Sequence, residues 1–185
     1  MKMSDKRTNK TITLGSGKLY CIEYAGTIPT DETIEAEANR LGYIKGGAKL
    51  EYAPEFYKTS DDLGIVTKQK LQSEEVKFTS GIMTWNLNVL KKLCATGRVT
   101  EENGLRTLKI GGLNNDDGKS YILHFVHEDK IDGDVRVTII GQNTAGFELE
   151  FTSDSETIVD AEFVALSMDD AGTLVIIKEE TSVQA

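Results

Sequence analysis

The segment from Leu41 to Gly97 constrains the fold of this chain more than any other part of the sequence. Apolar and charged residues alternate in it with the period of a two-faced strand, at Ala48, Lys49, Leu50, Glu51 and Tyr52. A polar turn and a second extended run follow, so the sequence predicts a long hairpin at about 47–79. Such a hairpin has little apolar surface near its tip and cannot stabilise itself. Something else has to pack on it.

A helix is predicted directly after the hairpin, at about 85–95. Thr84 is a suitable N-cap, and Gly97 suits the position just past the C-terminus. Apolar residues at spacings of three and four form one stripe, made of Trp85, Val89, Leu90, Leu93 and Cys94. This stripe indicates a helix that covers one end of a β-core, in preference to a cofactor-binding face.

Short strands and turns alternate through most of the remaining chain. Strands are expected at 19–24, 105–110, 121–126, 135–139, 147–152, 159–163 and 174–177, and 26–47 is expected to be a loop with one helical turn after Thr30. The predicted fold is all-β with one flanking α-helix, as a β-sandwich or a partly open barrel. A flexible N-terminal arm (1–17) precedes a single β-domain (18–178), and a polar tail (179–185) follows it.

Composition excludes several functional classes. The formal net charge of −9 disfavours binding to nucleic acid phosphates, although plain solubility explains such a charge equally well. No apolar run approaches the ~20 residues of a membrane helix, and no signal peptide is indicated. The two cysteines, Cys21 and Cys94, are expected to be buried thiols without a disulfide.

Candidate chemical motifs do not have the spacing that their chemistry needs. The run Gly15-Ser16-Gly17-Lys18 lacks the pattern of a phosphate-binding loop. His124 and His127 are three apart in a strand, so they leave opposite faces and cannot share a metal ion unless the strand bulges. The acidic turns do not match a calcium loop. We therefore expect no enzyme activity, no metal and no cofactor.

Several stretches together resemble the tail tube protein, also called the major tail protein, of long-tailed bacteriophages that infect Gram-positive bacteria. They are Gly17–Tyr20, Gly26–Glu32, Leu41–Ile44, Gly46–Ala48, Leu50–Tyr52, Pro54-Glu55, Ser80–Trp85, Leu123–Asp129 and Asp169–Leu174. None of them is a catalytic signature, so the resemblance depends on their number and order.

The resemblance implies a structural protein of the virion, assembled in the cytoplasm of the bacterial host. Six copies would form a ring, and stacked rings would form a hollow tube that conducts DNA during ejection. The implied partners are further copies of the chain, the tape measure protein, tail-completion or baseplate proteins, and DNA passing through without specific binding. No membrane is implied.

Two sets of site residues follow from this interpretation. Glu51, Glu148 and Glu150 are candidates for an acidic lumen, on the polar faces of the hairpin and of the predicted strand pair within 134–152, although these faces could equally point to outside solvent. The hairpin tip, Asp61-Asp62-Leu63, is a candidate contact between subunits or stacked rings, with an ordinary flexible turn as the alternative.

Three other interpretations remain open on the sequence alone. The same fold could serve as the inner tube of a contractile tail, a phage-like bacteriocin or a secretion system. A monomeric carbohydrate-binding β-sandwich would need exposed aromatic residues on one sheet face, whereas Trp85 is placed on the helix stripe. An enzyme is the least favoured, because no set of acid, base and nucleophile is apparent.

Overall fold

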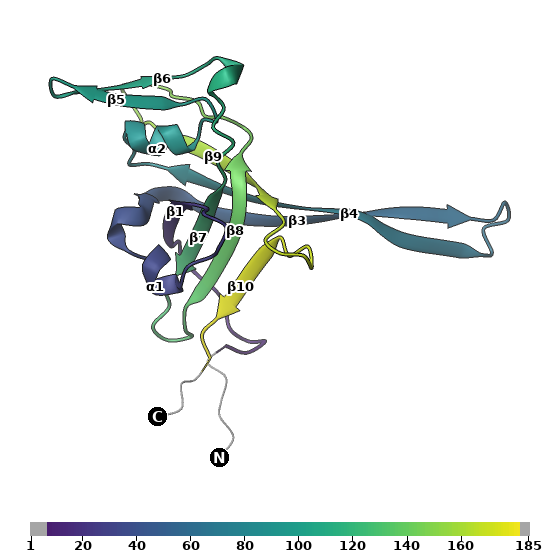
Figure 1. The fold of residues 1–185 in the computed structure, drawn as a ribbon. Helices are drawn as coiled ribbons and strands as arrows, with labels where there is room; N and C mark the ends of the chain where they lie inside the picture. Colours follow the sequence, from purple (N-terminus) through teal and green to yellow (C-terminus); the bar gives the residue numbers. More distant parts are fainter. Residues whose placement is uncertain (1–6, 182–185) are drawn as a thin grey trace.

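A single sheet of eight antiparallel strands dominates the computed structural model, which describes residues 7–181 (Figure 1). The main path of the sheet runs in the order β2-β1-β7-β8-β9-β4-β3, and β10 pairs with β8 off this path. The strands are β1 (Lys18–Glu23), β2 (Arg40–Gly42), β3 (Ile44–Ser60), β4 (Thr67–Ile82), β7 (Tyr121–His127), β8 (Val135–Asn143), β9 (Val159–Leu166) and β10 (Val175–Glu179). The separate hairpin of β5 (Arg98–Glu102) and β6 (Leu105–Lys109) forms a second sheet.

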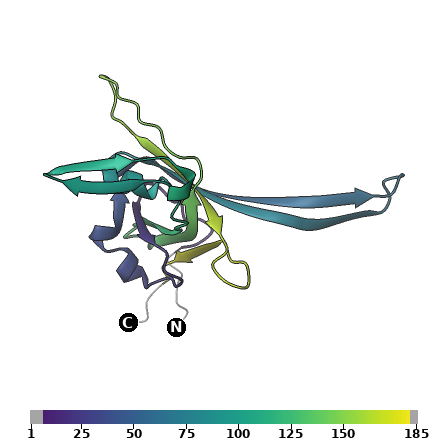
Figure 2. The same ribbon diagram turned by 45° about the horizontal axis from the view of Figure 1, so that its top comes forward.

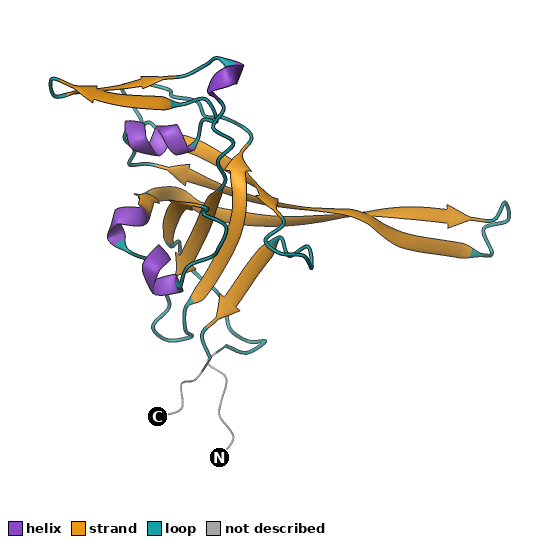
Figure 3. Ribbon diagram, viewed as in Figure 1, coloured by secondary structure: helices purple, strands orange, loops and turns teal. Residues whose placement is uncertain are grey.

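Helical structure is limited to short pieces (Figure 3). They are α1 (Asp31–Ile34), α2 (Leu87–Lys92) and the 3₁₀ turns η1 (Glu37–Asn39) and η2 (Leu113–Asn115). The expectation of a mostly β chain is therefore confirmed. None of the helices within 7–181 is long and apolar enough to cross a bilayer.

The large sheet curls so that its two ends come close together. β2 stands at one end of the strand order and β3 at the other, yet only Tyr43 separates them in the chain. The backbone N–H groups of Met83 and Thr84, just past β4, donate to the carbonyl of Tyr43 at 2.7 and 3.4 Å. The sheet therefore folds around its inner face as a partly open barrel.

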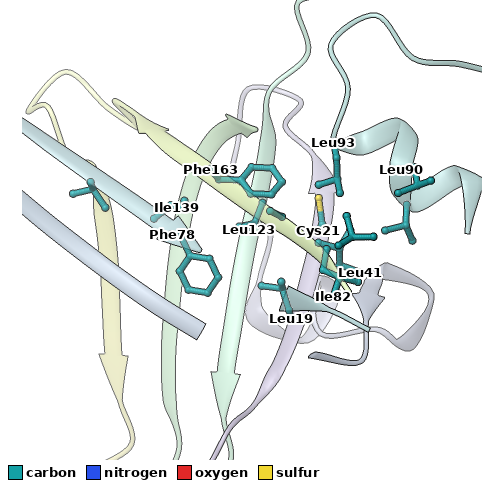
Figure 4. Close-up of a cluster of buried hydrophobic side chains, with 14 residues drawn as sticks. Leu19, Cys21, Leu41, Phe78, Ile82, Leu90, Leu93, Leu123, Ile139 and Phe163 are labelled. Carbon is teal, nitrogen blue, oxygen red and sulfur yellow. The ribbon is translucent and has the colours of Figure 1, made fainter. Parts of the chain in front are cut away.

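The principal core fills this curled sheet, and Figure 4 shows side chains from the strands of the large sheet and from α2 meeting there. Phe163, Leu123 and Ile139 form its centre and are almost fully buried. They share the interior with Leu19, Cys21, Leu41, Val76, Phe78, Ile82, Val89, Leu90, Leu93, Val159 and Ala161. Cys21 is buried and Cys94 half-buried, and both are free thiols as expected.

A smaller core lies on the outer face of β1, β7 and β8. Ile34, from α1, is fully buried against Tyr20, Ile122, Val126 and Ile140. Because both faces of β7 are covered, its residues are apolar nearly throughout, as the run at 121–126 predicted.

The predicted helix at 85–95 is shorter than expected and begins later. Asn86, not Thr84, is the N-cap of α2, and its Oδ1 accepts hydrogen bonds from the N–H groups of Asn88 and Val89. The Thr84 hydroxyl instead accepts from the N–H of Tyr43, 2.8 Å away. Val89, Leu90 and Leu93 are buried as predicted, while Trp85 precedes the helix and packs on the core from there.

The strand predicted at Phe147–Thr152 does not form. β8 ends at Asn143 and β9 begins at Val159, and within the part of the chain that the structure describes the connection between them pairs with no strand. The alternation of apolar and acidic residues still separates buried from exposed side chains. Phe147 and Leu149 pack on the principal core, whereas Glu148 and Glu150 are exposed. The strand pair expected within 134–152 is therefore wrong.

Residues 1–17 were predicted to be a mobile arm unless a neighbour holds them, and residues 7–17 contact the body of the same chain. The Arg7 guanidinium, only 10% exposed, donates through Nε and Nη2 to the carbonyl of Gly133. Gly17 lies so close to β7 that a Cβ would stand 2.2 Å from the Val126 carbonyl oxygen. Residues 1–6 lie outside the described part of the chain.

The polar tail predicted at 179–185 begins later than expected. Glu179 closes β10, and the N–H of Glu180 donates to the Asp134 carbonyl. Residues 182–185 also lie outside the described part.

The cap of α2 can be tested by comparing two asparagines. Asn86→Ala should lower the free energy of unfolding by about 1 kcal/mol, because two N–H groups lose their acceptor. Asn88→Ala makes the same chemical change at an exposed position without a capping role, and should alter it by less than about 0.5 kcal/mol. Urea unfolding of both variants checks this, and equal effects would contradict the assigned cap.

Candidate functional site

The most unusual feature of the molecule is the far part of the β3–β4 hairpin, which projects alone from the body (Figures 1 and 2). Every residue from 51 to 75 is exposed. β9 pairs with β4 only between Lys77 and Ile82, and beyond that point β3 and β4 pair with no third strand among residues 7–181. We call residues 51–75 the arm. Ten residues of β3 at about 3.3 Å each make it roughly 30 Å long.

The base of the hairpin is fixed by the body. Phe78 pairs with Leu50 in the hairpin and with Phe163 of β9, and packs 5.9 Å from the Phe125 ring. Gly46 and Gly47 form a bulge opposite β4, both with φ near +80°, and the Ser80 hydroxyl donates to the Gly47 carbonyl at 3.2 Å. The arm thus leaves a well-anchored base.

One face of the arm is mostly apolar over its inner half, although Glu74 also lies on it, and it becomes polar beyond Phe56. Leu50 and Phe78 pack on the core, and the next residues on the same side are Tyr52 and Val76. The stripe continues outward through Pro54, Phe56 and Leu71, across a second register shift beside Phe56. Tyr52 is 55% exposed, Phe56 50% and Leu71 40%. The side of the hairpin that packs on the core at its base is therefore exposed to solvent farther out, where no other described part of the chain packs against it.

The opposite face of the arm is largely polar and balanced in charge, with Tyr57 as its exposed aromatic residue. The lumen candidate Glu51 lies there and forms an ion pair with Lys49, whose hydrogen bond and charge lower the pKa of that carboxyl. Lys77 bridges Glu75 at 3.1 Å and Glu162 at 4.0 Å. Over residues 44–82 six lysines match six carboxylates, so the whole formal −9 belongs to the rest of the chain.

The tip of the arm is a compact turn. The Asp61 carboxylate accepts from the N–H groups of Val66 at 2.6 Å and Leu63 at 3.3 Å, which fixes the loop. The fold of the turn leaves Leu63, Ile65 and Val66 between 70% and 80% exposed. Asp61, Asp62 and Leu63 were predicted as contact residues from the sequence, whereas Ile65 and Val66 were not. Two apolar residues in a row beside a polar turn could have indicated them.

The other predicted site residues lie apart from the arm. Glu148 and Glu150 are exposed on the irregular connection between β8 and β9, on the side opposite to Phe147 and Leu149. The structure therefore does not bring Glu51, Glu148 and Glu150 together on one sheet face.

A buried polar network holds α1 against the outer face of the sheet. His124 is fully buried, with Nδ1 2.8 Å from the Thr138 hydroxyl and Nε2 3.1 Å from Glu35 Oε1. The same oxygen accepts from Arg136 Nε at 2.7 Å. Because a carboxylate only accepts, His124 carries its proton on Nε2 and accepts from Thr138 at Nδ1.

His127 lies on the opposite face of β7, as the spacing of the two histidines predicted. Its Nδ1 is 2.8 Å from the Ser16 carbonyl, which ties the N-terminal segment to the sheet. Its Nε2 is buried and has no hydrogen-bond partner among the residues that the structure describes. Between residues 7 and 181 no cluster of three or more His, Cys, Asp or Glu side chains is placed to hold a metal ion.

The His124 network makes stability depend on pH. Burial lowers the pKa of His124 below 6.5, more than Glu35 raises it. Burial also opposes ionisation of Glu35, but hydrogen bonds from Arg136 and His124 outweigh this effect and lower its pKa below 4.5. As the pH falls through 6.5, the unfolded state takes up a proton on His124 more readily than the folded state does. Near pH 4.5 the same holds for Glu35. Acidification therefore lowers the free energy of unfolding through both groups.

We expect the free energy of unfolding to fall between about pH 7.5 and 5.5. His124→Gln removes the titrating ring and keeps hydrogen-bonding capacity, so it should flatten this dependence. Urea unfolding at both pH values measures the slope. An unchanged slope in a folded variant would contradict the proposed role of His124.

Comparison with known proteins found no family model that matches this chain. No curated protein matches it either.

Proposed function

We propose that this chain is a structural subunit that assembles with copies of itself into a hollow tube, as a bacteriophage tail tube protein does. The single observation that carries the proposal is the arm, which is exposed throughout and carries exposed apolar residues on the inner half of one face and at its tip. A lone two-stranded ribbon is at best marginally stable in water. Burial of Tyr52, Phe56 and Leu71 by another copy would stabilise it by roughly 1 kcal/mol for each side chain, since each is already about half-covered.

Free strand edges support the same proposal. β3 ends the sheet path, so among the described residues no strand pairs with its outer edge between Ile44 and Ser60. Pro54 lies in this edge strand, where a missing donor does not break the sheet. Long free edges promote association between chains. A contact between two different surfaces of identical copies forms rings where the rotation closes and filaments where it does not.

Rings that stack would make the tip of the arm a contact between subunits or rings, through Leu63 and its neighbours. In a virion the tube would enclose the tape measure protein, end on tail-completion or baseplate proteins, and pass DNA without binding it specifically. The inner tube of a contractile machine would use the same assembly.

Assembly can be tested by shortening the arm. Replacing residues 54–74 with Asn-Gly joins Ala53 to Glu75, which already face each other, by a two-residue hairpin turn. The body should stay folded, because residues 51–75 are exposed throughout, while assembly should be lost. Electron microscopy should show rings or tubes for the full chain and separate particles for the shortened one.

A matched pair of substitutions separates the arm from general surface hydrophobicity. Phe56→Ser should weaken assembly, whereas Leu105→Ser, at a more exposed apolar residue on β6, should not. Separate particles from the full chain at every concentration, or tubes from the shortened chain, would overturn the proposal.

The acidic lumen is a second, independent part of the proposal. A wall of like charge would keep DNA hydrated and mobile, since clustered cations bind phosphate. Glu51 is balanced by Lys49, so Glu148 and Glu150 are the stronger candidates for such a wall.

Tubes that carry Glu148→Lys with Glu150→Lys should retain a short DNA duplex at low salt, while unmodified tubes should not. The control pair, Glu32→Lys with Glu102→Lys, changes the net charge equally at other exposed sites. Equal retention by both variants would dismiss the lumen assignment.

A further inference from the structure

The connection between β8 and β9 contains a segment with the sequence pattern of a strand that does not form one. Phe147–Thr152 has the period-two pattern of a strand, and its side chains alternate between half-buried and exposed as far as Glu150. None of its backbone N–H groups donates to a backbone carbonyl within the described chain. In Figure 2 this connection extends away from the body. The segment has the sequence of a strand but no ladder to complete.

This segment ends in an exposed patch rich in aromatic residues. Phe151 is 74% exposed and meets the half-buried Trp85 ring edge-on, at 6.5 Å between centroids. Tyr43 is 55% exposed, and its carbonyl accepts from the N–H of Met83, itself 39% exposed. Tyr43 and Trp85 line a common hollow, and Phe151 contacts Trp85, so we call these three residues the aromatic patch.

A shallow hollow adjoins the aromatic patch, and both Tyr43 and Trp85 line it. The Arg40 guanidinium stacks 4.0 Å from the centre of the Tyr43 ring, and its Nε is buried without a partner. Trp, Tyr and Arg are the residue types that contribute most binding energy at protein interfaces. The patch is therefore suited to a protein partner.

We propose that the arm of a second copy of this chain docks across Phe147–Thr152 and the aromatic patch. This inference rests on the proposed self-assembly and adds the receiving surface. The arm offers what the segment lacks, namely the free edge of β3 and an apolar face that carries Tyr52 and Phe56. Added alongside the segment, it would give those backbone groups a ladder and bury Phe151.

Two features favour a second copy as the occupant. The arm leaves the body in a different direction from the β8–β9 connection, so the two unsatisfied surfaces do not meet within one chain (Figures 1 and 2). The hairpin over 44–82 has zero formal charge, whereas the rest of the chain carries −9. A neutral arm can approach an acidic body of another copy without the repulsion that two bodies would experience.

Cysteine cross-linking tests the docking with the full chain. Copies with Phe151→Cys are mixed with copies that carry Tyr52→Cys, Phe56→Cys or Leu71→Cys and are then treated with a short thiol-reactive linker. At least one arm position should give cross-linked dimers at about tenfold higher yield than the same arm variants mixed with Leu105→Cys copies, because docking makes the reaction effectively intramolecular. The unmodified chain measures the background from Cys21 and Cys94.

Amide hydrogen exchange gives an independent readout on the unmodified protein. The N–H groups of Phe147–Thr152 should exchange at least about tenfold more slowly in assemblies than in the shortened-arm variant, since a ladder protects them. An unmodified chain that never assembles would refute the proposed function itself. Assemblies that lack the cross-links at all three positions, or whose 147–152 amides stay unprotected, would overturn this inference alone.

Discussion

The structure depends on the continuity of one apolar face along the β3–β4 hairpin. Side chains on alternate residues of a strand share a face, so the side that packs Leu50, Val76 and Phe78 into the core also carries Tyr52, Phe56 and Leu71. The body ends before the hairpin does. Because the register is fixed at the base, these apolar residues cannot turn away from solvent without pulling core residues out.

The base of the hairpin fixes that register through several local features. The Gly46-Gly47 bulge, the Ser80 hydroxyl and the β4–β9 ladder hold one pairing between the strands. Tyr43 joins both ends of the sheet order and closes the barrel, and it also borders the aromatic patch. The element that completes the fold thus lies beside the surface that we propose receives another copy. Closure of the sheet and docking of another copy would then both involve Tyr43 and the residues beside it.

Sequence periodicity correctly predicted the strands whose side-chain pattern directly reflects which faces are buried. The alternation from Ala48 to Tyr52 predicted the first strand of the hairpin, and the apolar run at 121–126 predicted a strand covered on both faces. It failed where tertiary contacts decide. Phe147–Thr152 has strand periodicity but pairs with no strand among the described residues. The N-terminal segment lacks apolar periodicity but is held by the Arg7 side chain and by the contact between His127 and the Ser16 carbonyl. The β5 strand was also missed, because Arg98–Glu102 is too polar to signal burial.

The candidate site was predictable only in part for the same reason. A poorly supported hairpin can be recognised from composition, whereas the residues that its tip exposes depend on how Asp61 folds the turn. Likewise, Trp85 belongs to a helical pattern in the sequence but stands outside the helix, because Asn86 is the stronger cap. Caps and turns compete over one or two residues, and period alone does not resolve them.

The central claim is that the isolated chain leaves apolar and hydrogen-bonding surface that only further copies of itself satisfy. Static light scattering of the full chain across a wide concentration range tests this most directly. The account predicts a mass that rises from the monomer to closed rings or longer species as concentration increases. A mass that stays at the monomer value up to the solubility limit would contradict it.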